Sequence, residues 1–188
     1  RKMARANINS LRTAGVERII TSSAGCGSSM KEYPELLKDD AEYRDKAERF
    51  SSMTQDVTEF LAGLPLQEPA AAINRRVTYQ DPCHLAHAQR ITAAPRKVLN
   101  SIPGLELVEM ENSSLCCGGA GIYSSVQPAL SQRLLKRKLE SIRDTGTQEV
   151  ITANPGCMLQ VQQGLRASKL PTKVRHVVDI LDEAYSLE

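Results

Sequence analysis

The chain has 188 residues, which suits one compact domain or two small ones. Apolar residues make up 41% and charged residues 24%, a composition typical of a soluble globular protein with a buried core. The net charge of +2 is too small to indicate nucleic-acid binding, and no apolar run approaches the ~20 residues that a membrane span needs. The N-terminal sequence RKMARANINSLR does not resemble a signal peptide, and a start inside a predicted helix suggests a fragment of a longer chain.

The first third of the chain predicts one helix and one strand, followed by further helices. The expected elements are a helix over 1–14 ended by Gly15, a buried strand over 16–21, a loop over 22–27, and two helices over 28–62 that break near Asp39 and Asp40. After them comes GLPLQEPAAAIN, a proline- and alanine-rich stretch typical of a linker. We therefore expect a partial first unit over 1–62, a linker over 63–75 and a second unit over 76–188.

In the second unit, predicted strands alternate with predicted helices. The strands are expected over 76–80, 105–110, 148–153 and 173–177, and the helices over 85–100 with an interruption near Pro95, 123–143, 158–167 and 178–186. Such alternation is typical of βαβ units with a parallel sheet. The predicted fold class is α/β, with a mostly parallel sheet and helices on both of its faces.

An internal repeat relates the two units. With an offset of 131, SLRTAGVERIITSSAGC aligns with SIRDTGTQEVITANPGC, and seven of the seventeen positions are identical. Further along, DVTEFL from Asp56 is similar to HVVDIL from His176. The sequence thus predicts two divergent copies of one α/β unit, of which the first is incomplete.

Cysteines follow the predicted strands of both copies. In a parallel sheet the carboxyl ends of the strands share one edge, where α/β folds place their sites. We therefore expect thiols that are distant in sequence to gather at that edge. They are Cys83, Cys116, Cys117 and Cys157 in the second copy and Cys26 in the first.

Thiolates at such an edge are typical ligands of an iron–sulfur cluster. Gly118 and Gly119 let the backbone approach sulfur and leave N–H groups free to point at it, and a helix that begins near Ser124 would favour negative charge. Structural zinc, a vicinal disulfide between Cys116 and Cys117, and thiol redox chemistry are the alternatives. A single cysteine such as Cys26 is as consistent with a small buried side chain as with a ligand.

The remaining polar candidates are ambiguous. His84 directly follows a candidate ligand and could hydrogen-bond the site or replace a ligand, whereas His87 and His176 are more typical of structural roles. A run of basic residues on the helix over 123–143 is predicted to be a solvated face in preference to a docking patch. That run comprises Arg133, Lys136, Arg137 and Lys138.

The cysteine spacing resembles that of the cysteine-rich CCG domain. That family has one cysteine, then CC-G, then C-x-x-C. Here 32 residues separate Cys83 from Cys116, Gly118 follows the pair, and 36 residues separate Cys117 from position 154. The family pattern has a cysteine at that position, but this chain has Asn154, and Ser23 stands at the matching place in the first copy. Four thiols remain in the second copy, enough for an ordinary [4Fe–4S] cluster and one fewer than the five-cysteine pattern of heterodisulfide reductases.

The segments AGCGSSMKEYPELL, DPCHLAHAQRI, CCGGAGIYS and ANPGCMLQ are most similar to the iron–sulfur subunits of glycolate oxidases within this family. The resemblance implies electron transfer from a flavin-containing dehydrogenase subunit towards a quinone, with no substrate chemistry on this chain. It implies an iron–sulfur cluster held by the cysteines, with His84, Asn154, Gly118 and Gly119 around it.

The same resemblance implies an N-terminal ferredoxin-like region outside this chain and a cytoplasmic location with at most peripheral membrane association. Two alternatives remain: a thiol–disulfide oxidoreductase of the heterodisulfide reductase type and a zinc-binding assembly module.

Overall fold

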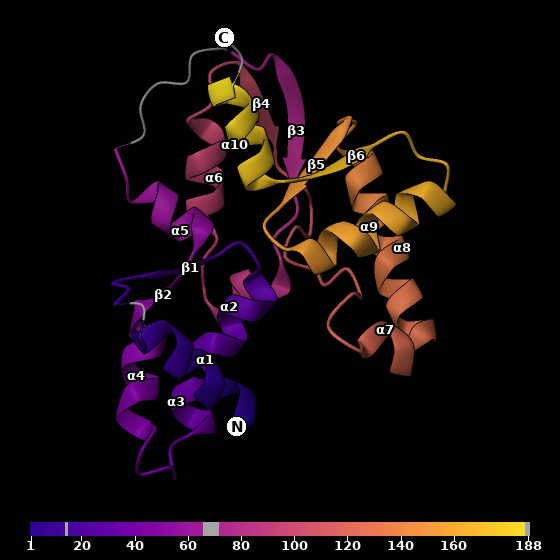
Figure 1. Ribbon diagram of the computed structural model, residues 1–188. Coiled ribbons are helices and arrows are strands. Elements are labelled where there is room, and N and C mark those ends of the chain that lie inside the picture. Colours follow the sequence, from indigo (N-terminus) through magenta and orange to yellow (C-terminus); the bar gives the residue numbers. More distant parts are fainter. Residues whose placement is uncertain (14, 66–71, 187–188) are drawn as a thin grey trace.

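The computed structural model describes residues 1–13, 15–65 and 72–186, and it has an α/β fold with two parallel sheets (Figure 1). The smaller sheet has the order β1-β2, and the larger has the order β4-β3-β5-β6. All of the strand pairs are parallel, which confirms the predicted fold class. The predicted linker over 63–75 includes residues 66–71, which lie outside the described residues.

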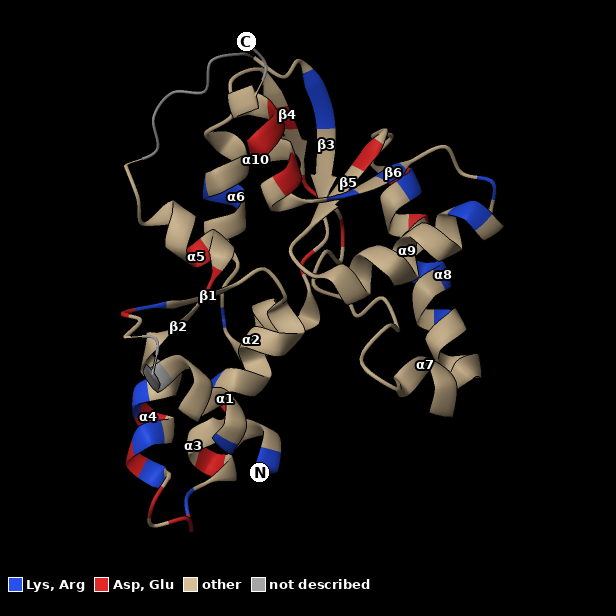
Figure 2. Cartoon of the chain, in the orientation of Figure 1, with Lys and Arg blue, Asp and Glu red and all other residues tan. Residues whose placement is uncertain are grey.

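The smaller sheet belongs to the N-terminal part of the chain. Its elements are α1 (Lys2–Thr13), β1 (Ile19–Thr21), α2 (Ala24–Lys31), α3 (Tyr33–Leu36), α4 (Arg44–Met53), β2 (Thr54–Asp56) and α5 (Val57–Ala62). A small core holds α1, β1, α3 and α4 together, and in it the rings of Tyr33 and Phe50 stack with their centroids 5.2 Å apart. On the surface, α4 carries dense positive and negative charge (Figure 2).

The larger sheet belongs to the rest of the chain. Its elements are β3 (Arg75–Tyr79), η1 (His84–Ala88), α6 (Ala93–Asn100), β4 (Leu105–Val108), α7 (Tyr123–Val126), α8 (Pro128–Asp144), β5 (Glu149–Thr152), α9 (Pro155–Ala167), β6 (Lys173–His176) and α10 (Val177–Ser186). Helices α6 and α10 cover one face and α8 and α9 the other. All four residues of β5 are buried, because this central strand packs against helices on both sides.

Several predicted boundaries were wrong. The region 28–62 forms four helices and the strand β2, not two helices. The helix expected over 85–100 breaks at residues 89–92, and Pro95 lies inside α6. The helix expected over 123–143 divides at Gln127, and α9 begins at Pro155, so that Cys157 lies in its first turn.

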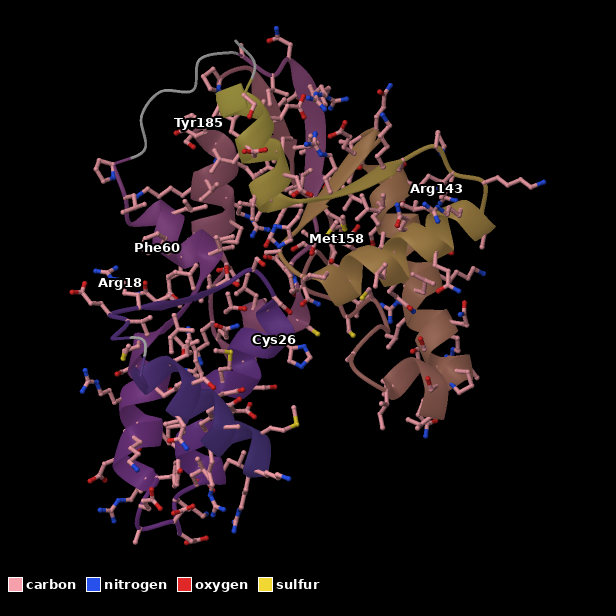
Figure 3. All side chains as sticks on the ribbon, viewed as in Figure 1. Arg18, Cys26, Phe60, Arg143, Met158 and Tyr185 are labelled. Carbon is pink, nitrogen blue, oxygen red and sulfur yellow. The ribbon has the colours of Figure 1, made fainter. Side chains whose placement is uncertain are left out.

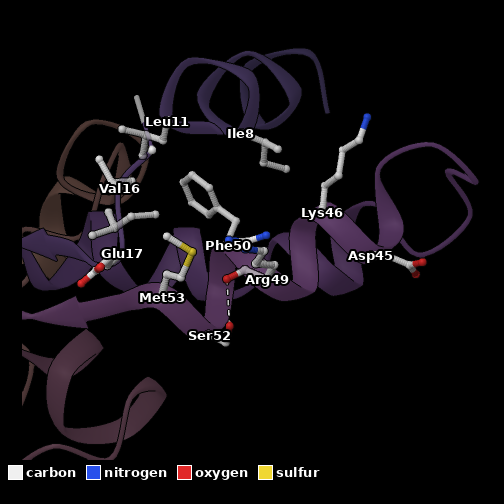
Figure 4. A pocket seen from close by; sticks show the side chains of 12 residues that line it. Ile8, Leu11, Val16, Glu17, Asp45, Lys46, Arg49, Phe50, Ser52 and Met53 are labelled. Carbon is white, nitrogen blue, oxygen red and sulfur yellow. Dashed lines mark hydrogen bonds between the residues drawn. The ribbon is translucent and has the colours of Figure 1, made fainter. Parts of the chain in front are cut away.

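A cavity of about 830 Å³ opens between α1, β1 and α4 (Figure 4). Ile8, Leu11 and Phe50 are among the side chains that line it, and none of the five cysteines does. This hollow therefore belongs to the smaller core and not to the predicted site. In the described part of the chain, no helix combines the length and apolar character needed to cross a membrane.

Candidate metal centre

Three neighbouring strand ends bring four cysteines together. Strands β4, β3 and β5 are adjacent and parallel. The loop after β4 carries Cys116 and Cys117, the loop after β3 carries Cys83, and the helix α9 that follows β5 carries Cys157 in its first turn. The Sγ atoms of Cys83 and Cys116 are 3.9 Å apart. Cys117 acts on the pKa of both Cys116 and Cys157, so it lies between them in a row of four thiols. We call these four residues the cysteine row.

The cysteine row alternates between thiols that donate and thiols that accept. Hydrogen bonds from Cys117 and Cys83 lower the pKa of Cys116, and hydrogen bonds from Cys117 and Asn154 lower the pKa of Cys157 against the effect of burial. Donation and burial raise the pKa of Cys83 and of Cys117. Without a bound group, the row therefore favours thiolates at Cys116 and Cys157. All five cysteines are free, so the vicinal pair is not oxidised in this structure.

Glycine backbone supports the middle of the row. The N–H of Gly118 donates to Cys116 Sγ at 3.3 Å, and the N–H of Gly119 hydrogen-bonds Cys117. Gly118 has φ +84°, and a Cβ there would lie 2.5 Å from the carbonyl oxygen of Ser131. A side chain is thus excluded where the loop passes α8, and the close approach of backbone to sulfur depends on glycine.

Ion pairs and hydrogen bonds connect the loop before Cys83 to its neighbours. Asp81 is buried and makes a two-point ion pair with Arg96, both N–O distances being 2.9 Å. Arg96 also pairs with Glu109 and lies over the ring of Tyr79, which ties this loop to the end of β4. The Asp81 N–H donates to the carbonyl of Ser113, at 3.2 Å. Sequence reasoning missed this clamp, which holds two cysteine loops in register.

Asn154 joins Cys157 to the first copy. Its side-chain N–H donates to Cys157 Sγ at 3.3 Å, while its Oδ1 accepts from the N–H of Gly25 at 3.3 Å and from the Ser23 hydroxyl at 3.4 Å. Figure 3 shows Cys26 on α2 and Met158 on α9, at the facing ends of these two helices. Cys26 is exposed, and within the described residues none of the recorded sulfur contacts involves it.

The histidines have three different environments. His84 begins the π-helix η1, and its Nδ1 lies 3.6 Å from Cys83 Sγ, so it borders the row. His87 bonds the Ser114 carbonyl at 3.1 Å and supports the loop before the cysteine pair. His176 accepts from the Val178 N–H at Nδ1 and donates from Nε2 to the Ser22 carbonyl, which links the two copies.

Lys138 contradicts the predicted solvated basic face. Arg133, Lys136 and Arg137 are exposed, but the Lys138 side chain is fully buried beneath the cysteine loops. Its Nζ donates to the carbonyl oxygens of Asn112 at 2.9 Å and Ser113 at 2.8 Å. Lys138 lies on the inner stripe of α8 with Leu135 and Ile142, and this spacing puts it on the side that packs against the sheet.

The residues fit a sulfur-ligated cluster by their donor chemistry. The row supplies thiols only, two of them favoured as thiolates, with backbone N–H groups directed at sulfur and a buried ammonium nearby. The N-terminal turns of α2 and α9 carry no charged side chain (Figure 2). Among residues 1–13, 15–65 and 72–186, no three His, Cys, Asp or Glu side chains form a group that could hold a metal ion as they stand.

Comparisons with known proteins identify relatives over nearly the whole chain. The model of the cysteine-rich domain CCG matches residues 1–31 and 77–162. The "Probable glycolate oxidase iron-sulfur subunit" of Bacillus subtilis is 38% identical over 98% of this chain and 42% of its own length. One subunit of the "Fumarate reductase (CoM/CoB)" of Methanothermobacter marburgensis is 40% identical over 92% of this chain and 33% of its own length. The chain thus spans less than half of either relative.

A solved structure supports the fold. The crystal structure of a hypothetical protein from Helicobacter pylori superposes with a TM-score of 0.57 and 14% identity, covering 82% of this chain and 32% of the other. At that identity the similarity concerns the architecture alone.

Proposed function

Because the chain belongs to the family of the cysteine-rich CCG domain, we propose that its cysteine row holds an iron–sulfur cluster of an oxidoreductase of the glycolate oxidase type. The row itself carries the proposal, because three strand ends bring four thiols together. Cys83 and Cys116 are in sulfur contact, and N–H groups donate to Cys116 and Cys157. The name of the Bacillus subtilis relative favours iron–sulfur chemistry over zinc. A bound cluster would accept and release single electrons.

In this proposal each residue has a defined task. Cys83, Cys116, Cys117 and Cys157 supply the ligands, and a set of four suits a [4Fe–4S] cluster. Gly118, Gly119 and Asn154 donate hydrogen bonds to sulfur, which stabilises negative charge on the ligands and raises the reduction potential. His84 borders Cys83 from outside the row.

The proposed partners follow from the same relatives. A flavin-containing dehydrogenase subunit would oxidise the 2-hydroxy acid and deliver electrons to this chain, which would pass them on towards a quinone. A ferredoxin-like region of the same subunit would lie outside the 188 residues. We propose a cytoplasmic complex with at most peripheral membrane contact, and no role for nucleic acid.

A thiol–disulfide oxidoreductase is the second candidate, and two observations favour it. The CoM/CoB fumarate reductase relative is 40% identical to this chain. Cys83 and Cys116 are partly exposed whereas Cys117 and Cys157 are buried, so one end of the row is open to solvent. A disulfide substrate could approach the row from this open end.

Elemental analysis of anaerobically purified protein tests the proposal. We expect several irons and acid-labile sulfide per chain, with a paramagnetic signal after one-electron reduction. One zinc per chain without sulfide would instead identify an assembly module and overturn it. Cluster-dependent reduction of small disulfides to thiols, with an added one-electron donor that supplies two electrons per disulfide and no flavin subunit present, would favour the second candidate.

A further inference from the structure

The buried ammonium group of Lys138 has hydrogen-bond partners but no ion-pair partner. It donates to two consecutive carbonyl oxygens, those of Asn112 and Ser113, and lies 4.0 Å from Met110 Sδ. Throughout the described residues, no carboxylate lies within 4.0 Å of its Nζ. The side chain is fully buried, so water does not compensate its charge.

An unpaired buried cation is unfavourable unless negative charge lies close by. Burial lowers the pKa of Lys138 to about 8, and the charges of Cys117, Asp81, Cys157 and Cys116 act against that effect. Of these four, Asp81 is already neutralised by its two-point ion pair with Arg96. The remaining negative charge beside Lys138 belongs to the cysteine row.

We infer that Lys138 is a positioning residue that supplies the countercharge of the cysteine row and raises the reduction potential of the group held there. The inference rests on the proposed function. Lys138 acts through two connections: its charge favours the more negative, reduced state, and its hydrogen bonds hold the turn from which Cys116 and Cys117 project. Reduction adds one electron to the bound group, and no proton from Lys138 is required.

Lys138→Gln separates the charge from the hydrogen bonds, because glutamine is neutral and still donates an N–H. Lys138→Arg keeps the charge. Lys136→Met is the matched control, since it removes one positive charge from an exposed position of the same helix. The four proteins are loaded with iron and sulfide anaerobically, analysed for both elements, and titrated by a spectroscopic redox measurement.

We expect Lys138→Gln to lower the equilibrium constant for one-electron reduction about tenfold, a fall of about 59 mV, with Lys138→Arg and Lys136→Met within twofold of wild type. Loss of iron from the Gln variant alone would also support a need for the charge. Two results would overturn the inference and leave Lys138 a packing role. One is a loaded Gln variant whose reduction potential equals that of the wild type, and the other is loss of iron from both the Gln and the Arg variants. If the wild-type protein retains no iron or sulfide after loading, that result would instead refute the proposed function on which the inference rests.

Discussion

The two copies of the repeat have the same local structure but different surroundings. In both, a helix leads to a short strand and then to a helix with glycine and cysteine in its first turn: α1, β1 and α2 in one, α8, β5 and α9 in the other. Strand β5 pairs with β3 and β6, whereas β1 pairs with β2 alone within the described residues. Ile151 is accordingly 0% exposed and its counterpart Ile20 is 40% exposed.

The same difference separates the two cysteines. Cys157 is 5% exposed and lies at the end of a row of four thiols, while Cys26 occupies the matching place in α2 and is exposed. A local motif thus determines where a cysteine sits on its helix. The neighbouring strands β3 and β4, with the loops that follow them, determine whether that cysteine meets other sulfurs. Four experiments test this interpretation, and they run from the largest expected effect to the smallest.

Replacing the two matched cysteines gives the sharpest contrast. We expect Cys157→Ser to abolish the retention of iron and sulfide, because it removes one of four ligands, and Cys26→Ser to leave both unchanged. The measurement is iron and sulfide per chain after anaerobic loading. Equal losses in the two variants would mean that the first copy contributes a ligand, and the distinction between the copies would fail.

The second contrast concerns the loop that only the second copy possesses in this chain. A Cβ at Gly118 would meet the Ser131 carbonyl oxygen at 2.5 Å at a φ of +84°, whereas at Gly121, with φ +50°, nothing lies within 4 Å. We expect Gly118→Ala to reduce the free energy of unfolding by roughly 3–5 kcal/mol and Gly121→Ala by roughly 1–2 kcal/mol. Urea denaturation of the two variants measures both. Similar losses of unfolding free energy in the two variants would show that the positive φ alone sets the cost and that the contact with α8 adds nothing.

The third contrast uses the matched isoleucines. Ile151→Ala should cost about 2–5 kcal/mol, because it opens a cavity between β5 and the helices α6 and α10. Ile20→Ala should cost under about 1 kcal/mol, since Ile20 already contacts solvent. Urea denaturation of the two variants and the wild type measures these differences in unfolding free energy. A large decrease in the unfolding free energy of Ile20→Ala would contradict the interpretation that the face of β1 carrying Ile20 is open to solvent.

The smallest expected effect concerns the residue before the last helix of each copy, Asp56 before α5 and His176 before α10. Burial raises the pKa of Asp56, against hydrogen bonds from Thr58 and the charge of His176, while Glu59 adds to the rise. The folded protein therefore binds this proton more tightly than the unfolded chain. Its contribution is greatest below the unfolded pKa of ~3.9 and is lost as pH rises through the folded pKa.

Asp56→Asn removes this titration and keeps an oxygen to cap α5. We expect its stability at pH 7 to equal or exceed that of the wild type, with a smaller decrease between acidic and neutral pH. Asp56→Ala, the control without a cap, should be about 1 kcal/mol less stable than Asp56→Asn at both pH values, because neither variant has the carboxyl group and only the cap differs. Thermal unfolding across pH tests this, and an Asn variant with an unchanged pH dependence would assign that dependence to other groups.

The strand and helix order of the second copy could be predicted because each strand contains at least one β-branched residue and lies between turn residues. Strand β2 was missed because Thr54–Asp56 has no apolar pattern. Its position was nonetheless implied by the repeat, since β6 directly precedes the segment that DVTEFL resembles. The early start of α9 had a signal too, as proline is favoured in the first turn of a helix.

In the site, topology predicted which thiols meet, because parallel strands share their carboxyl edge. The clamp of Asp81 and Arg96 could not be predicted, since it depends on how α6 packs beside β4. Lys138 was misinterpreted because its charge was given more weight than its spacing. It lies three residues after Leu135 and one before Leu139, on the buried stripe of α8.

The order of the strands in the larger sheet has a consequence for how the protein matures. Strand β5 lies between β3 and β6, although both β3 and β4 precede it in the chain. A polypeptide emerging from the ribosome therefore displays Cys83, Cys116 and Cys117 well before Cys157 reaches its place. If the row holds a cluster as proposed, its four ligands are all present only once synthesis has passed α9, so insertion of the cluster would follow synthesis of this part of the chain.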